Sequence, residues 1–308
     1  LCNNDYVQSD PQVAELKQSD FASHYRELEA KFEVNFRQTE VSYVSPVNFV
    51  ESSISPRHRW FPYKEGFSPS FVRSVLDEAR LDFDKVVLDP FSGVGSTCIT
   101  AASMGYRSLG IEISPLANFI ALTKSITKDQ LNSKAIGGLI ETLENAQARD
   151  AVEPPENETV RSYFQDEIFQ AILEVKSLIA ETKSAESMLL KLALLANLET
   201  FSTHRRAGNG VKRKSKPNEA LSENEARHWI GRVLVAALRQ MVEDIKTSPL
   251  QISPEFRIGS SLDVAVPLDL PSIGCVITSP PYPNCFDYSK IYQRELWMGD
   301  FLKGPDGL

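Results

Sequence analysis

Cysteine and histidine are scarce in this sequence, with four of each among 308 residues. The cysteines form no Cys-x-x-Cys pair and have no histidine at zinc-finger spacing, so no disulfide framework or structural metal is indicated. The histidines have no carboxylate or serine at triad-like spacing, and we assign them no catalytic role. We therefore expect reduced thiols, no metal site and no catalytic triad.

Long apolar runs are also missing, because no stretch approaches the ~18 consecutive apolar residues of a membrane helix. The first residues, Leu1 to Asp5, lack the basic start and apolar run of a secretory signal. They also lack an initiator Met, which indicates a trimmed chain. The composition, 42% hydrophobic and 24% charged, is that of an ordinary globular protein of about two domains. We expect a cytoplasmic protein that binds no membrane.

Positive charge is in the minority, since 33 Lys and Arg face 41 Asp and Glu, which argues against an indiscriminate polyanion binder. The segment from His204 to Lys216 is the exception and contains no acid. Its basic residues are Arg205, Arg206, Lys212, Arg213, Lys214 and Lys216. Such a segment offers a phosphate backbone one place to dock. Its charge and Gly208-Asn209-Gly210 predict a flexible loop that orders on binding, with a solvated loop without a partner as the alternative.

Apolar residues at helical spacing predict a helix within residues 10–40, a short helix at 70–79, and a helical block between about 118 and 249. Strand signals vanish in this block, and the basic segment lies between its second and third helices. The three helices of the block are marked by Phe164 to Ile179, by Met188 to Leu198, which is apolar nearly all round, and by Trp229 to Ile245.

A βαβ unit precedes the block. A buried strand at 85–91 is followed by a glycine turn at 92–96, a helix of small residues at 97–104 and a second strand at 107–112. Two such strands within ~30 residues are parallel and joined by a right-handed crossover. Strand signals return at 255–258 and at 274–278.

The glycine turn is suited to a nucleoside ligand. Gly93 and Gly95 lack Cβ atoms, so a ligand can approach the backbone there. Asp89 ends the first strand and Glu112 ends the second, where an acid meets ribose hydroxyls in dinucleotide-type folds. The Lys-Ser/Thr pair of a P-loop is absent, which excludes that phosphate site.

The segment Ser279-Pro280-Pro281-Tyr282 follows the last predicted strand. Two prolines cannot continue a central ladder, so the chain leaves the sheet at its carboxyl edge, where ligands bind in open α/β sheets. The Ser279 hydroxyl and the Pro280 carbonyl can accept hydrogen bonds. A base can stack on Tyr282, a contact worth ~1–3 kcal/mol.

Together these motifs resemble the S-adenosylmethionine-dependent DNA amino-methyltransferases. The resemblance rests on the Asp-Pro-Phe-x-Gly-x-Gly-x-Thr turn from Asp89 to Thr97, on Glu112 and on the Ser-Pro-Pro-Tyr segment. Serine in its first position resembles the N4-cytosine branch, whereas the adenine-N6 branch usually has Asp or Asn there. The resemblance covers about residues 32–118 and 250–300.

The resemblance implies S-adenosylmethionine as cofactor and assigns residues to its site. Asp263 corresponds to an acid near the adenine. Tyr63 and Phe67 belong to an aromatic-proline stretch that closes over the methionine end, although the commoner His-Pro-Tyr-Pro-Ala-Lys pattern is not kept here. The cofactor residues are then Asp89, Phe91, Gly93, Gly95, Thr97, Glu112, Asp263, Tyr63 and Phe67, and the catalytic ones are Ser279, Pro280, Pro281 and Tyr282.

The implied function is transfer of a methyl group to the exocyclic N4 of a flipped-out cytosine in DNA. The basic residues at 205–216 are then expected to contact DNA phosphates. Three alternatives remain open: adenine-N6 methylation at the same site, methylation of an RNA base, and a catalytically silent subunit that binds DNA or a partner.

The expected fold is an α/β, Rossmann-like methyltransferase sheet, mostly parallel, with a large helical insertion. We expect a helical arm at 1–55, a discontinuous core at 56–118 and 250–308, and an insertion at 119–249 that contacts DNA. Family members have about three more strands after the Ser-Pro-Pro-Tyr strand, so the sheet is expected to be incomplete at its C-terminal side. Either the chain is truncated or a second chain completes the sheet.

Overall fold

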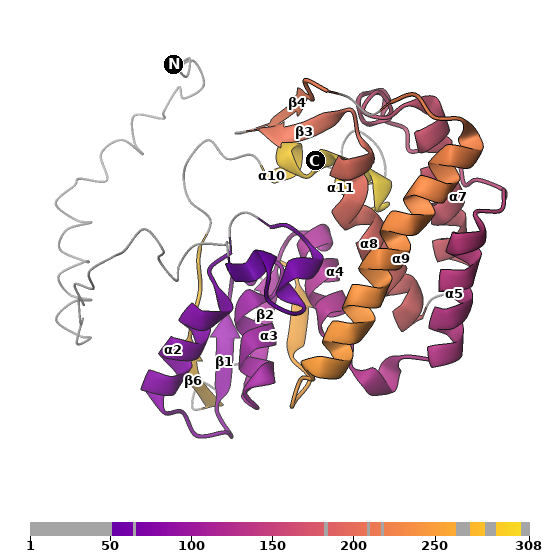
Figure 1. Ribbon diagram of the computed structural model, residues 1–308. Helices are drawn as coiled ribbons and strands as arrows, with labels where there is room; N and C mark the ends of the chain where they lie inside the picture. The colour runs from indigo at the N-terminus through magenta and orange to yellow at the C-terminus, as the bar shows by residue number, and fades with distance from the viewer. Residues whose placement is uncertain are drawn as a thin grey trace, which may run out of the picture. The chain divides into compact units, whose positions relative to one another are not determined.

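Four parallel strands form the sheet of the computed structural model, in the order β5-β2-β1-β6 (Figure 1). The strands are β1 (Val86–Asp89), β2 (Arg107–Glu112), β5 (Glu255–Ile258) and β6 (Ile273–Val276). Leu88 of β1 pairs with Leu109 of β2 and with Val276 of β6. The predicted parallel βαβ unit and the α/β fold class are confirmed.

The structure describes residues 51–63, 66–181, 184–207, 210–216, 219–262, 272–280 and 288–302. These residues belong to one unit, Pro46–Leu308. The helix predicted within residues 10–40 lies outside the described residues, as do Asp263, Pro281 and Tyr282.

Helices α2 (Pro69–Ala79) and α3 (Ser96–Ser103) cover one face of the sheet. Helix α2 begins at a proline, and its first turn is capped because the Ser68 hydroxyl accepts the Phe71 N–H at 3.2 Å. Leu76 of α2, Val87 of β1 and Ala101 of α3 are fully buried in the shared core. This packing fixes the start of α3 at the carboxyl end of β1, where the glycine turn lies.

The helical block contains α4 (Pro115–Lys124), α5 (Ser133–Asn145), α6 (Glu158–Arg161), α7 (Asp166–Ala180), α8 (Ala185–Phe201) and α9 (Glu223–Thr247). The three helices predicted here are confirmed. Helix α8 is apolar nearly all round because α4, α7 and α9 all pack against it. The expected domain boundary at 118/119 falls inside α4, which contacts both β5 and α8.

The basic segment was predicted as a loop in a strand-free block, and the predicted absence of strands is wrong. Strands β3 (His204–Ala207) and β4 (Gly210–Arg213) form an antiparallel hairpin. Two backbone bonds fix its base: Thr203 donates to the Tyr163 carbonyl at 2.8 Å, and Lys214 donates to the Thr203 carbonyl at 2.8 Å. The charge of Arg206 is also neutralised inside the protein by Glu199 and Glu295, which lowers the repulsion between the basic residues of the segment.

The remaining described helices are short: η1 (Glu51–Ser53), η2 (His58–Trp60), η3 (Lys128–Gln130), α10 (Tyr288–Ile291) and α11 (Gln293–Met298). Asp244 of α9 ties η2 to the helical block. Its buried carboxylate accepts the Trp60 indole N–H at 2.8 Å and pairs with Arg59 at 2.5 Å. This contact holds the segment that leads to Tyr63. No described helix is long and apolar enough to cross a membrane.

Candidate cofactor and methyl-transfer site

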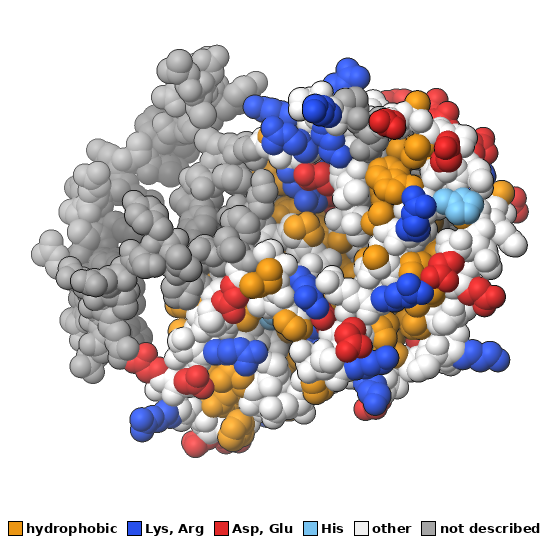
Figure 2. Space-filling model, in the orientation of Figure 1, with side chains coloured by type: hydrophobic (Ala, Val, Ile, Leu, Met, Phe, Trp, Pro, Cys, Tyr) orange, Lys and Arg blue, Asp and Glu red, His pale blue; other side chains and the backbone are white. Residues whose placement is uncertain are grey.

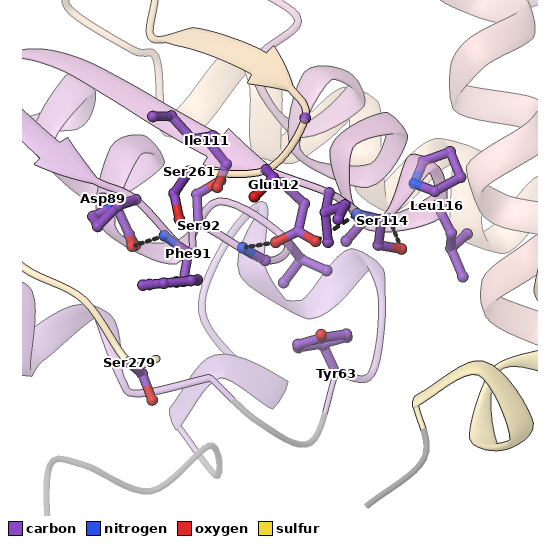
Figure 3. A pocket seen from close by; sticks show the side chains of 18 of the residues that line it. Tyr63, Asp89, Phe91, Ser92, Ile111, Glu112, Ser114, Leu116, Ser261 and Ser279 are labelled. Atoms are coloured by element: carbon purple, nitrogen blue, oxygen red, sulfur yellow. Dashed lines mark hydrogen bonds between the residues drawn. The ribbon is translucent and has the colours of Figure 1, made fainter. Parts of the chain in front are cut away.

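A cavity of about 790 Å³ opens at the carboxyl ends of the strands (Figure 3). Its lining includes most of the predicted site residues that the structure describes: Tyr63, Phe67, Asp89, Phe91, Gly93, Glu112, Ser279 and Pro280. Segments from opposite ends of the sequence therefore meet in one cavity. Gly95 and Thr97 lie just behind it at the start of α3, and the buried Thr97 hydroxyl donates to the Ile277 carbonyl at 3.3 Å.

The glycine turn has the backbone that the sequence predicted. Gly93 and Gly95 have φ values of 51° and 84°, in the left-handed region. A Cβ on Gly95 would lie 3.0 Å from the Ala121 Cβ and 3.0 Å from the Phe256 ring, so the turn also depends on close packing. Gly93 leaves its side of the turn open to the cavity.

Glu112 is the last residue of β2 and lies beside the glycine turn. Its Oε2 accepts the Gly93 N–H at 2.8 Å and its Oε1 accepts the Ser114 N–H at 2.7 Å (Figure 3). Burial raises the pKa of Glu112, and these backbone N–H groups oppose the rise. Each carboxylate oxygen has a second lone pair, so Glu112 can accept two further hydrogen bonds from a ligand.

Asp89 is the second carboxylate of the cavity and is 3% exposed. Its Oδ1 accepts the Phe91 N–H at 3.1 Å. Burial raises the pKa of Asp89, and the Phe91 N–H opposes that rise. Among the described residues that line the cavity there is no Lys, Arg or His. The cavity therefore favours a ligand that carries positive charge and hydroxyl donors.

One wall of the cavity is aromatic. Tyr63 stacks on Tyr292, with ring centroids 5.3 Å apart and planes 12° apart. Tyr292 lies between α10 and α11, and Leu296, Phe301 and Leu302 extend this wall. These C-terminal residues were not predicted from the sequence, because only the fold brings them to the glycine turn.

The mouth of the cavity is apolar. Phe91, Ile113 and Leu262 line it and are 39%, 70% and 92% exposed. Exposed apolar side chains around a cavity are typical of a ligand site. Ile113 and Leu262 were also missed, since single apolar residues after strands have no distinctive pattern.

The end of β6 reaches the same cavity. Ile277 donates to the Leu88 carbonyl at 3.1 Å, and the chain then leaves the sheet at its carboxyl edge. The side chain of Ser279 lies across the opening from Tyr63 (Figure 3). Within the described residues, no group of three or more His, Cys, Asp and Glu could hold a metal ion.

The hairpin places its basic residues on two sides. Arg205, Lys212, Arg213 and Lys216 are exposed, and Lys and Arg gather over β3 and β4 at the top of the molecule in Figure 2. Lys214 is half-buried, with its ammonium donating to the Glu199 carbonyl at 2.8 Å. Arg206 is buried, which corrects its prediction as a surface contact for phosphates. Strand alternation turns its side chain inward, where Glu199 and Glu295 pair with it.

Comparison with known proteins finds similar methyltransferases. A family model described as DNA methylase matches residues 36–121. Type II methyltransferase M.AvaI of a Nostoc species is 26% identical over 94% of this chain and 64% of its own length. Type II methyltransferase M.BsoBI of Geobacillus stearothermophilus is 26% identical over 93% of this chain and 59% of its own. The chain thus spans about three fifths of the length of these relatives. No solved structure matches it significantly.

Proposed function

The chain belongs to the DNA amino-methyltransferase family, and on that premise we propose that it methylates the exocyclic N4 of a cytosine in DNA. S-adenosylmethionine, when bound, supplies an electrophilic methyl group on a sulfonium. The observation that carries the proposal is the convergence of Glu112, the glycine turn and Ser279 on one cavity. Its relatives are type II methyltransferases, which suggests that the chain is part of a restriction-modification system.

The residues present fit this cofactor. It carries positive charge on its sulfonium and ammonium groups, and the cavity offers Asp89 and Glu112 with no basic residue among its described lining. Glu112 has lone pairs for the two ribose hydroxyls. We assign Tyr63 and Phe67 to the methionine end, and the apolar mouth at Ile113 and Leu262 to the faces of the adenine. Asp263 is assigned to the adenine from the sequence alone.

The chain's own residues then position the acceptor base. The amino group of cytosine is a weak nucleophile, because its lone pair is delocalised into the ring. Acceptors at the Ser279 hydroxyl and the Pro280 carbonyl can hold its two hydrogens and favour a tetrahedral nitrogen. Direct transfer needs positioning rather than a covalent intermediate with the protein. A base within a duplex cannot reach this cavity, so it must be flipped out, with Pro281 and Tyr282 holding its face.

Ser279 supports cytosine rather than adenine as the methylated base, because serine in the first position of the segment resembles the N4-cytosine branch. Ser279→Asp should abolish cytosine transfer or shift methylation toward adenine, whereas full cytosine activity in this variant would remove Ser279 from the base contact. Activity on RNA alone would favour the RNA alternative. The domain division and the catalytic role of the Ser-Pro-Pro-Tyr segment are part of the same proposal.

Calorimetric titration with S-adenosylmethionine separates an enzyme from a silent subunit. We expect the wild-type chain to bind the cofactor, and Tyr282→Ala to bind it about as well while losing methyl transfer. A wild-type chain that binds no cofactor would contradict the proposed function. Tyr282→Ala with unchanged transfer would contradict the stacking role.

A further inference from the structure

The hairpin has two faces with different surroundings. Arg205 and Arg206 are adjacent on β3, so their side chains point to opposite sides of the strand. Arg205 is exposed, and the side chain of Arg206 is 6% exposed. The two residues thus share one strand and one side-chain type, but only Arg206 is buried and paired with carboxylates.

Arg206 is held by a buried network of charges. Its Nη2 lies 2.5 Å from Oε1 of Glu295 in α11, and its Nη1 lies 3.5 Å from Oε2 of Glu199 in α8. Arg294 donates to the same Glu199 oxygen at 3.1 Å and to the His204 carbonyl at 2.9 Å. Glu295 and Arg294 are fully buried. A buried charge with this many partners has a fixed orientation.

The guanidinium of Arg206 also lies over the aromatic wall of the cavity. Its Cζ is 4.9 Å from the centroid of Tyr292 and 5.9 Å from that of Phe61. Tyr292 in turn stacks on Tyr63, and both tyrosines line the cavity. A continuous set of contacts therefore runs from the inner face of the hairpin to the wall opposite Ser279.

We propose that Arg206 is a positioning residue for cofactor binding: it orients Tyr292, and through Tyr292 the Tyr63 ring, while the outer face of the same strand contacts DNA. This inference rests on the proposed function. The physical basis is that a cation over an aromatic ring, fixed by two carboxylates, restrains that ring more than apolar packing does. The hairpin then serves the cofactor with one face and DNA with the other.

The test compares Arg206→Met with Arg205→Met. S-adenosylmethionine affinity is measured by calorimetry without DNA, and the salt dependence of binding is measured with a mixed-sequence duplex. Arg206→Met should raise the cofactor Kd about fivefold or more and keep the salt slope. Arg205→Met should keep the cofactor Kd and reduce the salt slope by up to ~0.9.

Arg206→Met leaves Glu295 without one of its partners and can unfold the protein. Arg206→Lys therefore serves as the second variant, because it keeps the charge but cannot lie flat on Tyr292 while bonding two carboxylates. It should keep the melting temperature within a few degrees and still raise the cofactor Kd. Combination with Tyr292→Leu should add little to this rise, since a shared effect is non-additive.

The outcomes are distinct. If the wild-type chain binds the cofactor and Arg206→Lys binds it equally well, the inference is overturned while the proposed function stands. An equal rise in Kd for Arg205→Met would also overturn it, because any change in the hairpin would then have the same effect. A wild-type chain that binds no cofactor overturns the proposed function itself.

Discussion

The backbone N–H of Gly93 donates to Oε2 of Glu112 at 2.8 Å, so the acid that ends β2 also holds the glycine turn that follows β1. The sequence predicted both residues as cofactor contacts but not their contact with each other. The double role means that Glu112→Ala would disturb the turn as well as the ligand contact. A substitution that keeps the size of the side chain is therefore the better test.

Glu112→Gln should weaken S-adenosylmethionine binding by ~1.5–3 kcal/mol, the value of hydrogen bonds to a charged acceptor. Calorimetry would then show a roughly ten- to hundredfold higher Kd. The free energy of unfolding should fall less, by about 1 kcal/mol, because one of the two backbone N–H groups loses its acceptor. Glu255→Gln, at an exposed position of β5, is the control and should change neither value. Unchanged affinity in Glu112→Gln would remove this carboxylate from the site.

The cofactor affinity should depend on pH in a defined direction. Burial raises the pKa of Asp89 from 3.8 and of Glu112 from 4.5. The folded protein thus binds protons on these groups more tightly than the unfolded chain does. Their contribution to the free energy of unfolding therefore falls as the pH rises from their unfolded to their folded pKa values.

A bound cation favours the ionised carboxylates, so cofactor affinity should increase with pH across the same window. Calorimetry in two buffers of different ionisation enthalpy, just above the unfolded pKa values of 3.8 and 4.5, should show proton release on binding that diminishes as the pH rises. Absence of proton release at the lower pH would mean that neither carboxylate faces the charge of the cofactor.

Gly95→Ala should destabilise the protein by about 1–3 kcal/mol, because φ is 84° and the new Cβ would press on Ala121 and Phe256. The same substitution at Gly137 in the exposed face of α5 meets no atom within 4 Å and should stabilise by about 0.5–1 kcal/mol. Urea unfolding measures both changes. Equal effects of the two substitutions would show that the left-handed turn is not required.

Arg205→Gln, Lys212→Gln and Arg213→Gln together should weaken binding to every DNA sequence and flatten its salt dependence by up to ~0.9 per lost phosphate contact. Lys134→Gln in α5 is the control, as an exposed cation outside the hairpin. Retention of the wild-type salt slope with loss of only the preferred site would show that the hairpin reads bases instead.

The sequence predicted the parts of the fold whose signals are local. Alternation of strand, glycine turn and helix between residues 85 and 112 was enough for the βαβ unit, and the apolar run at 188–198 was enough for a buried helix. The hairpin escaped prediction because its strands are basic and lack an apolar face. Arg206 can be buried only because Glu295, far along the chain, lies against it.

The residues that line the cavity also fall into those that the sequence predicted and those that it did not. The glycine turn and Glu112 carry a spacing that can be recognised in the sequence. Tyr292, Leu296 and Phe301 have no such spacing, and only the packing of α11 against α8 brings them to the cavity. Contacts between distant segments bring these residues to the site, and such contacts leave no recognisable pattern in a single sequence.

Analysis of nucleosides by mass spectrometry tests the central claim most directly. Unmethylated DNA is incubated with the chain and S-adenosylmethionine, digested to nucleosides and compared with DNA treated with the Tyr282→Ala variant. The account predicts that N4-methyl-2′-deoxycytidine is present after treatment with the wild-type chain and absent after treatment with the variant. DNA that carries N6-methyladenine instead, or no methylated nucleoside although the chain binds the cofactor, would contradict it.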